Sequence, residues 1–343
     1  STTGGFMSDG TYLYCPVYEW TDNSGQVQRS APGIPISVVL TGGTTTQRVT
    51  LTIGTLRLTA KTAAYGRKEV VVAAFRTENN GSIAYRVTPL SAPVFNNPAV
   101  DSVSVIDGLS DASLVSNELI YTTGGVLENT SPPSSNLIHA QKNRVFYVSP
   151  EDPNTVGYSK KMVAGEAVEF SDALKKRIGP EGGNITAIFS LDEKILIFKK
   201  RLMYFFSGDG PNDTGTSDQF TDVQLITADV GCIDPSSLSA TPVGVVFKSE
   251  KGIYILGQDL SVKYVGAKVE QFNAQNVTSA DLLSDVNQVR FLTSSGSELC
   301  FNYYFDEWTT ASNHEGKDAV VWRGVYAYLR NNGTVFVENS SKY

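Results

Sequence analysis

Apolar and polar residues alternate in short runs along the first part of the chain, and turn-forming residues separate the runs. The runs span residues 12–20, 26–30, 36–40, 49–59, 69–77 and 82–88. Alternation with a period of two is typical of β-strands that have one buried face. Residues 70–75, with the sequence VVVAAF, are instead almost continuously apolar, which predicts a strand buried on both faces.

The turns between these runs also favour strands. Asn79, Asn80 and Gly81 lie between two of the runs, and Asn and Gly tolerate the positive φ angles that tight hairpin turns require. Turn signals spaced by roughly eight to twelve residues are typical of sandwich domains. We therefore predict an all-β domain over residues 1–120, a β-sandwich of the immunoglobulin or fibronectin-III type with its strands at about residues 11–120.

A Pro-rich segment separates this domain from a repetitive second half. The sequence NTSPPSS at residues 129–135 is the clearest predicted linker, because paired prolines cannot continue the interior of a sheet. Beyond it, a strand, a tight turn and a second strand recur five times. The first strands of these hairpins are residues 143–148, 194–198, 243–247, 288–292 and 325–329.

The length of the repeat indicates its architecture. One aromatic residue marks each copy: Phe146, Phe198, Phe247, Phe291 and Tyr328. The copies are spaced by 52, 49, 44 and 37 residues, about the length of a four-stranded propeller blade. A further strand is predicted upstream of each hairpin, for example at residues 185–191 and 236–240. We predict a β-propeller-like domain over residues 121–343, whose five units need not close a ring. A stacked sandwich is the alternative, and the only helix expected here is residues 171–177.

Composition narrows the range of functions. Only 18% of the 343 residues are charged, and the net charge is −7. Such a chain is poorly suited to grip a phosphate backbone, because affinity for nucleic acid comes mainly from clustered Lys and Arg. The short basic runs at residues 160–161, 175–177 and 199–201 are therefore expected to be solvated strand edges.

Cysteine use and apolar run length add two further expectations. Cys15, Cys232 and Cys300 have neither metal-ligand spacing nor the density of a disulfide scaffold, so we expect buried free thiols. No apolar run reaches the roughly 18 residues of a transmembrane helix. The chain opens at Ser1 without Met, as expected of a fragment or a processed product.

Few residues suggest site chemistry. His139 and His314 are the only histidines, too few and too isolated for a catalytic triad or an imidazole-rich metal site. The oxygen-rich loop at residues 207–218 offers Asp209, Asp213 and Asp218 as weak candidate ligands for a hard cation such as Ca²⁺. It lacks the EF-hand order, so an ordinary exposed loop is the favoured interpretation. We expect no enzymatic activity and no cofactor.

A pair of carboxylates for glycoside hydrolysis remains an alternative, because propellers can host that chemistry and sequence spacing does not reveal the separation of the two groups. The candidates are Asp192, Glu193, Asp229, Asp234, Asp306 and Glu307.

The second half also carries a succession of turn motifs. They are YTTGGVLENTSPP (121–133), KNRVF (142–146), EDPNTVGYSK (151–160), SGDGPNDTG (207–215), DVGC (229–232), SEKGIYIL (249–256) and YVGAKVE (264–270). In this order they resemble the tail nozzle or tail-hub proteins of short-tailed bacteriophages, over roughly residues 115–343. These motifs are structural turns and contain no catalytic signature.

The resemblance implies a structural role in the virion. It suggests a propeller-containing subunit arranged in a ring, usually a hexamer, below the portal and adaptor proteins. The genomic DNA would pass through the central channel without tight binding, in agreement with the acidic, weakly charged composition. The first domain looks like the fibronectin-type insertion of some of these tail proteins. A host-surface adhesin of the tail is the first alternative, and a glycan-cleaving propeller enzyme is the second.

Overall fold

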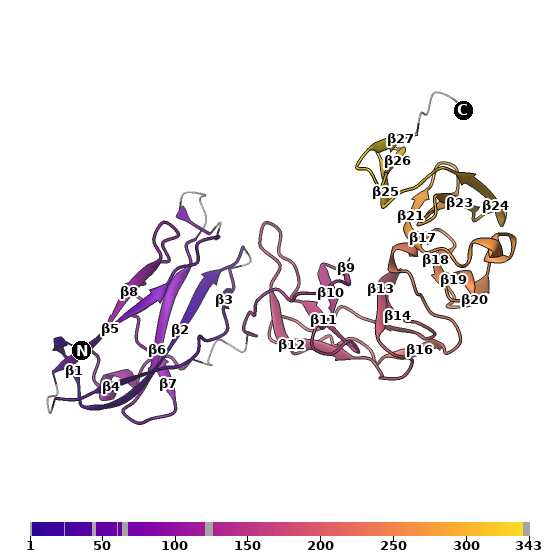
Figure 1. Ribbon diagram of the computed structural model, residues 1–343. Coiled ribbons are helices and arrows are strands. Elements are labelled where there is room, and N and C mark those ends of the chain that lie inside the picture. Colours follow the sequence, from indigo (N-terminus) through magenta and orange to yellow (C-terminus); the bar gives the residue numbers. More distant parts are fainter. Residues whose placement is uncertain are drawn as a thin grey trace. The chain divides into compact units, whose positions relative to one another are not determined.

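The computed structural model describes residues 2–23, 25–42, 46–59, 61–63, 68–120 and 126–338, and it is almost entirely β-structure (Figure 1). Contacts divide the chain into two compact units. The first contains residues 1–132, 159–174 and 212–216, and the second contains residues 133–158, 175–211 and 217–343. Residues 121–125, with which the first tail-protein motif begins, lie outside the described residues. The all-β prediction is confirmed.

Two antiparallel sheets form most of the first unit. The smaller sheet has the order β1-β5-β8, and the larger has the order β3-β2-β6-β7 with β4 paired to β2. The strands are β1 (Thr2–Met7), β2 (Gly10–Thr21), β3 (Val27–Arg29), β4 (Ile36–Leu40), β5 (Gln47–Gly54), β6 (Val71–Thr77), β7 (Ala84–Arg86) and β8 (Ser102–Asp107). The turn between β6 and β7 contains Asn80 with a φ of 54°, as the Asn-Asn-Gly signal predicts.

One core lies between these two sheets. Tyr12 and Val72 of the larger sheet are buried together with Ile53 and Val105 of the smaller one and with Leu114. Leu114 belongs to the short helix α1 (Asp111–Leu114), whose N-cap is Ser110. The opposite face of the larger sheet is also covered, because Val17 and Phe75 belong to a second buried cluster. Strand β6 is therefore buried on both faces, which confirms the interpretation of its continuous apolar sequence.

Five antiparallel sheets follow. The first four have four strands each, in the orders β12-β11-β10-β9, β13-β14-β15-β16, β17-β18-β19-β20 and β21-β22-β23-β24, and the fifth has the order β25-β26-β27. Sequential pairing of this kind is typical of propeller blades, so the arrangement is consistent with a propeller-like fold. All five predicted hairpins are present.

The strands of the first three of these sheets have the following bounds: β9 (Ile138–Gln141), β10 (Arg144–Val148), β11 (Thr155–Ser159), β12 (Phe170–Arg177), β13 (Ile185–Leu191), β14 (Lys194–Lys199), β15 (Met203–Ser207), β16 (Gln224–Thr227), β17 (Ser239–Thr241), β18 (Gly244–Ser249), β19 (Gly252–Gly257) and β20 (Val262–Tyr264). The strands of the last two are β21 (Val277–Leu283), β22 (Gln288–Thr293), β23 (Ser297–Asn302), β24 (Glu307–Ser312), β25 (Asp318–Trp322), β26 (Val325–Leu329) and β27 (Val335–Val337). Two 3₁₀ segments connect them, Pro235–Ser237 and Gly266–Phe272.

Buried clusters join neighbouring sheets in sequence. The rings of Phe146 and Phe206 lie 6.2 Å apart between the first and second sheets, and Phe198 and Phe247 lie 5.4 Å apart between the second and third. A cluster containing Phe291 joins the third sheet to the fourth. Another joins Leu283 and Leu292 to Tyr326 and Tyr328 of the fifth sheet. All five aromatic markers of the repeat are therefore core residues.

The predicted helix at residues 171–177 is wrong, because this segment lies within strand β12. The run Lys175-Lys176-Arg177 has a good intrinsic helix propensity, but tertiary pairing overrides such preferences. Strand β12 is the neighbour of β11 in the first four-stranded sheet, and the backbone of Phe170 bridges that of Thr130.

Candidate functional site

The three candidate cation ligands have separate surroundings. Asp209 is exposed and lies 3.5 Å from the Lys142 ammonium. Asp213 accepts a hydrogen bond from the Gln28 amide at 3.4 Å, and Asp218 is exposed, with a φ of 42°. Within the described ranges, no three side chains of His, Cys, Asp or Glu gather closely enough to hold a metal ion.

Five of the six carboxylates considered for glycoside hydrolysis have ion-pair or hydrogen-bond partners among the described residues, and Asp192 lies in a turn. Asp234 accepts a hydrogen bond from the Val277 backbone N–H at 2.9 Å. Asp192 has a φ of 49° and lies in the turn between β13 and β14. The other four form ion pairs with lysines: Glu193 with Lys142, Asp229 with Lys251, Asp306 with Lys263, and Glu307 with Lys268.

Each histidine is held in a separate environment. His139 on β9 lies 3.0 Å from the Ser190 hydroxyl, and burial lowers the pKa of its imidazole. His314 follows β24, and its Nδ1 lies 2.9 Å from the Glu298 carboxylate on β23. Glu298 is itself buried, and burial raises the pKa of its carboxyl.

The prediction that the short basic runs lie at solvated strand edges is wrong for Lys160 and Lys199, because both side chains are buried. Lys160 Nζ donates to Gln28 Oε1 at 2.9 Å and to the Leu127 carbonyl at 2.5 Å. Lys199 Nζ likewise donates to the carbonyls of Gly179 and Glu181. These lysines satisfy backbone carbonyls of connecting segments, which buried loops require.

Lys248 repeats the arrangement of Lys199 one sheet further along the chain. Both lysines follow the marker phenylalanine of their repeat, at the end of the first strand of the hairpin. Lys248 Nζ donates to the carbonyls of Asn273 and Gln275 at 2.9 and 2.8 Å. Burial lowers the pKa of both ammonium groups. Two copies of the repeat thus share a buried lysine that binds backbone carbonyls, in addition to their apolar core.

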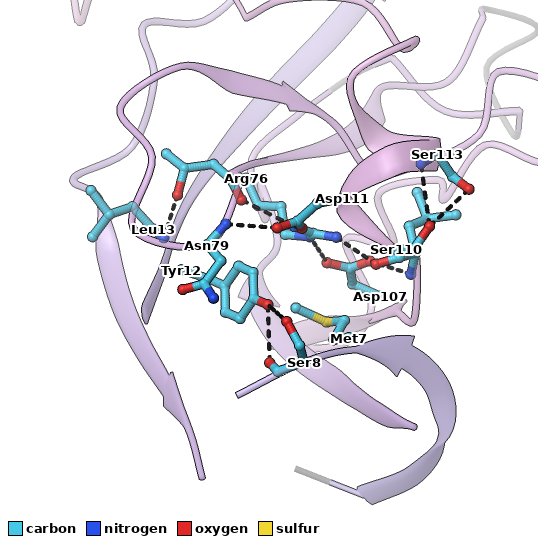
Figure 2. Close-up of polar contacts among 12 residues, drawn as sticks. Met7, Ser8, Tyr12, Leu13, Arg76, Asn79, Asp107, Ser110, Asp111 and Ser113 are labelled. Atoms are coloured by element: carbon cyan, nitrogen blue, oxygen red, sulfur yellow. Dashed lines mark hydrogen bonds and ion pairs between the residues drawn. The ribbon is translucent and has the colours of Figure 1, made fainter. Parts of the chain in front are cut away.

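An ionic cluster centred on a fully buried pair connects the two sheets of the first unit (Figure 2). Arg76 on β6 lies 2.6 Å from Asp107 on β8 and 2.6 Å from Asp111 at the start of α1. The Tyr14 hydroxyl donates to Asp107 at 2.7 Å, and burial, followed by the charge of Asp107, raises the pKa of Tyr14. The Arg76 and Asp107 side chains at its centre are closed off from solvent, so we interpret this cluster as structural.

A second ionic cluster covers the opposite face of the same sheet. Arg29 and Arg86 both contact Glu19 and Glu118, and both guanidinium groups lie over the Phe75 ring, at 5.6 and 5.8 Å. Positive charges above an aromatic face are attracted by its quadrupole. Neither ionic cluster leaves an unpaired charge for a reaction.

The first unit also contains a cavity of about 790 Å³. Its wall includes Trp20 at the end of β2, Leu56 and Leu58 after β5, Asn129, and Glu169 immediately before β12. A largely apolar cavity with a few convergent polar groups is the usual form of a small-molecule site. No local sequence pattern predicts this cavity, because its lining comes from segments that lie far apart in the chain.

The polar side chains of this cavity form a connected group. Trp20 Nε1 donates to Glu169 Oε1 at 2.8 Å, and the Lys160 ammonium lies 4.0 Å from the same carboxylate. Burial raises the pKa of Glu169. Asn129 is only 8% exposed, and neither its amide nitrogen nor its amide oxygen makes a hydrogen bond of good geometry.

Comparison with known proteins gives only distant structural similarity. No family model matches the sequence, and no curated protein is similar to it. Solved structures that resemble it include PorZ of the type-IX secretion system of Porphyromonas gingivalis and Sqt1 of Saccharomyces cerevisiae, each with 12% identity and a TM-score of 0.41. The match with PorZ covers 63% of this chain and 28% of PorZ, and the match with Sqt1 covers 62% of this chain and 60% of Sqt1.

BamB from Moraxella catarrhalis is also similar, with 10% identity and a TM-score of 0.41 over 98% of this chain and 84% of BamB. Similarity at this level carries no argument about function. Among the described residues, no helix is long and apolar enough to cross a membrane.

Proposed function

We propose that this chain is a structural subunit of a bacteriophage tail, a nozzle or hub component that assembles with further copies of itself into a ring. On this proposal the first unit is a fibronectin-III-like or immunoglobulin-like sandwich, and the five sheets of the second unit are blades of a β-propeller. The turn motifs that resemble tail nozzle proteins suggested the role, and the surface of the fifth sheet supports self-association.

The observation that carries the proposal is the uncovered apolar surface of the fifth sheet. Trp322 on β25 is 68% exposed, and Val335 and Val337 on β27 are 60% and 63% exposed. Contiguous apolar surface of this kind usually marks a contact with another molecule. Closed cyclic assemblies cover such surfaces and the edges of sheets at the same time.

The proposed partners follow from this role. Copies of the chain would form a ring, in the usual case a hexamer, that contacts portal, adaptor or other tail proteins within the virion. The genome would pass through the ring without tight binding, since the net charge of −7 repels phosphate. We propose no catalytic activity; of the carboxylates considered for it, four are paired with lysines and Asp234 is hydrogen-bonded.

Measured mass tests the assembly. Light scattering of the purified chain over a range of concentrations should give a multiple of the single-chain mass. Trp322→Glu and Val337→Glu should reduce this mass to that of one chain. Ile34→Glu, at a residue that is 88% exposed in the first unit, is the matched control and should leave the mass unchanged. A wild-type chain that stays monomeric at every concentration would contradict the proposal.

A specific observation favours the alternative role of a host-surface adhesin. Tyr304 and Phe305 are 62% and 75% exposed in the turn between β23 and β24. The Asn302 side chain fixes this turn by accepting hydrogen bonds from both backbone N–H groups at 3.1 Å. Tyr304 also lines a cavity of about 580 Å³ together with Asp259 and Asp306. If the chain binds to host cells, and if Tyr304→Ser and Phe305→Ser abolish this binding, the adhesin role would be favoured.

A further inference from the structure

The cavity beside Trp20 has two walls of different chemistry. Its apolar part is formed by the Trp20 indole with Leu56, Leu58, Val70, Pro132 and Val168. Its polar part contains the Glu169 carboxylate and the Asn129 amide. Every lining residue belongs to the first unit. The site therefore suits a ligand with one apolar face and several hydrogen-bonding groups.

Asn129 gives the strongest indication of a ligand. Its amide oxygen has no hydrogen-bond partner although the residue is 92% buried. The amide also makes a polar contact with Glu169 that lowers the pKa of that carboxyl, against the larger effect of burial. A buried acceptor without a donor is unfavourable. A ligand hydroxyl that donates to this oxygen would supply the missing hydrogen bond.

The charged groups around the cavity exclude an ionic ligand. The Lys61 ammonium forms an ion pair with Glu166, and both side chains are largely buried. Arg57 forms an ion pair with Asp101 at 2.5 Å. Both cations that line the cavity among the described residues thus already have a carboxylate, which disfavours a phosphate or a sulfate. The Glu169 carboxylate accepts the Trp20 N–H and faces the Lys160 ammonium, and this disfavours a cation.

We propose that this cavity binds a neutral saccharide. Each sugar hydroxyl both donates and accepts, so two neighbouring hydroxyls can pair with the nitrogen and the oxygen of the Asn129 amide, once the amide turns toward them. A third hydroxyl can donate to Glu169. The C–H face of the sugar ring packs against the Trp20 indole, an aromatic surface with a polar edge.

An adjoining cavity suggests that more than one sugar residue is bound. It has a volume of about 890 Å³ and is lined by Pro16, Tyr18 and Asp172 as well as by residues of the first cavity. The residues shared by the two cavities are Trp20, Leu56, Asn129, Thr130 and Pro132. An oligosaccharide that crosses this shared wall would contact both cavities, so we expect affinity to rise with chain length.

Titration of the full chain with defined neutral oligosaccharides tests the proposal. The probes are hexamers of glucose, mannose, galactose and N-acetylglucosamine, measured by calorimetry and by ligand-observed NMR. At least one hexamer should bind, more tightly than its monosaccharide. Asn129→Ala and Trp20→Leu should each weaken binding by about tenfold, the loss expected when a buried hydrogen bond or a stacking contact is removed.

Further variants keep the test independent of folding and assembly. Leu58 is fully exposed at the cavity, so Leu58→Glu should preserve the fold and still weaken binding. Trp322→Glu, which removes the proposed ring contact in the second unit, should bind with wild-type affinity. Absence of binding for all four hexamers at millimolar concentration would overturn the proposal. So would binding that Asn129→Ala and Leu58→Glu leave unchanged, or binding of adenosine or of sulfated sugars in place of neutral ones.

Discussion

The Arg76 guanidinium lies 2.6 Å from the Asp107 carboxylate, and both side chains are fully buried (Figure 2). Arg76 belongs to β6 of the larger sheet and Asp107 to β8 of the smaller sheet, so this pair fastens one sheet of the first unit to the other. The apolar core between the sheets does not determine their alignment by itself, since apolar contacts have no direction. The ion pair adds a directional constraint.

Replacing Arg76 should destabilise the first unit strongly. Arg76→Met leaves the Asp107 carboxylate buried without its partner, and breaking a buried ion pair in this way typically costs about 3–5 kcal/mol. The control is Arg57→Met, which removes a more exposed pair with Asp101 and should cost less than about 1 kcal/mol. Chemical denaturation measures both values, and equal effects for the two variants would show that the buried pair has no special role.

Lys248 should contribute more to stability than its exposed neighbour Lys251. Lys248→Met leaves the carbonyls of Asn273 and Gln275 without their shared donor, and about 1–3 kcal/mol is expected for each group that stays unsatisfied. Lys251→Met removes only an exposed pair with Asp229, worth about 0–1 kcal/mol. Thermal unfolding should show a clear decrease in Tm for the first variant alone. A Lys248→Met chain that unfolds like the wild type would contradict this assignment.

Glu169 should make stability depend on pH in mildly acidic solution. Burial raises the pKa of this carboxyl above 4.5 in the folded chain, so the folded state binds more protons than the unfolded state between pH 4.5 and the raised value. The free energy of unfolding should therefore decrease as pH rises through that window. Glu169→Gln should lack this component, so the stability of the wild type relative to the variant should fall with rising pH. A relative stability that rises with pH would refute the sign.

The cysteines should resist modification in the native state. Burial raises the pKa of Cys232 to about 12 and that of Cys300 to about 11, and it also raises the pKa of Cys15. Since the thiolate is the reactive form, iodoacetamide at pH 8 should label the folded chain very slowly. In denaturant all three thiols should react, and mass spectrometry can count the labels added to each chain. Rapid labelling of Cys232 without denaturant would be inconsistent with this environment.

Much of the architecture could be predicted from the sequence because its signals are local. Hydrophobic alternation and the Asn-Gly turn can each be recognised from a stretch of a few residues. The aromatic markers Phe198 and Phe247 indicate the repeat directly. The burial of Lys199 could not be predicted, since its partners are backbone carbonyls and any residue supplies those. The cavity beside Trp20 could not be predicted either, because Asn129 and Glu169 are brought close to Trp20 only by the tertiary fold.

The consecutive packing of the five sheets has a mechanical consequence. Each buried cluster between them, such as the one around Phe291 or the one around Tyr328, joins one sheet to the next. In stacked repeats of this kind, stability is approximately a sum over neighbouring contacts. Under a pulling force, we therefore expect the junctions between sheets to open one at a time, so that unfolding of one terminal sheet leaves the distant sheets folded.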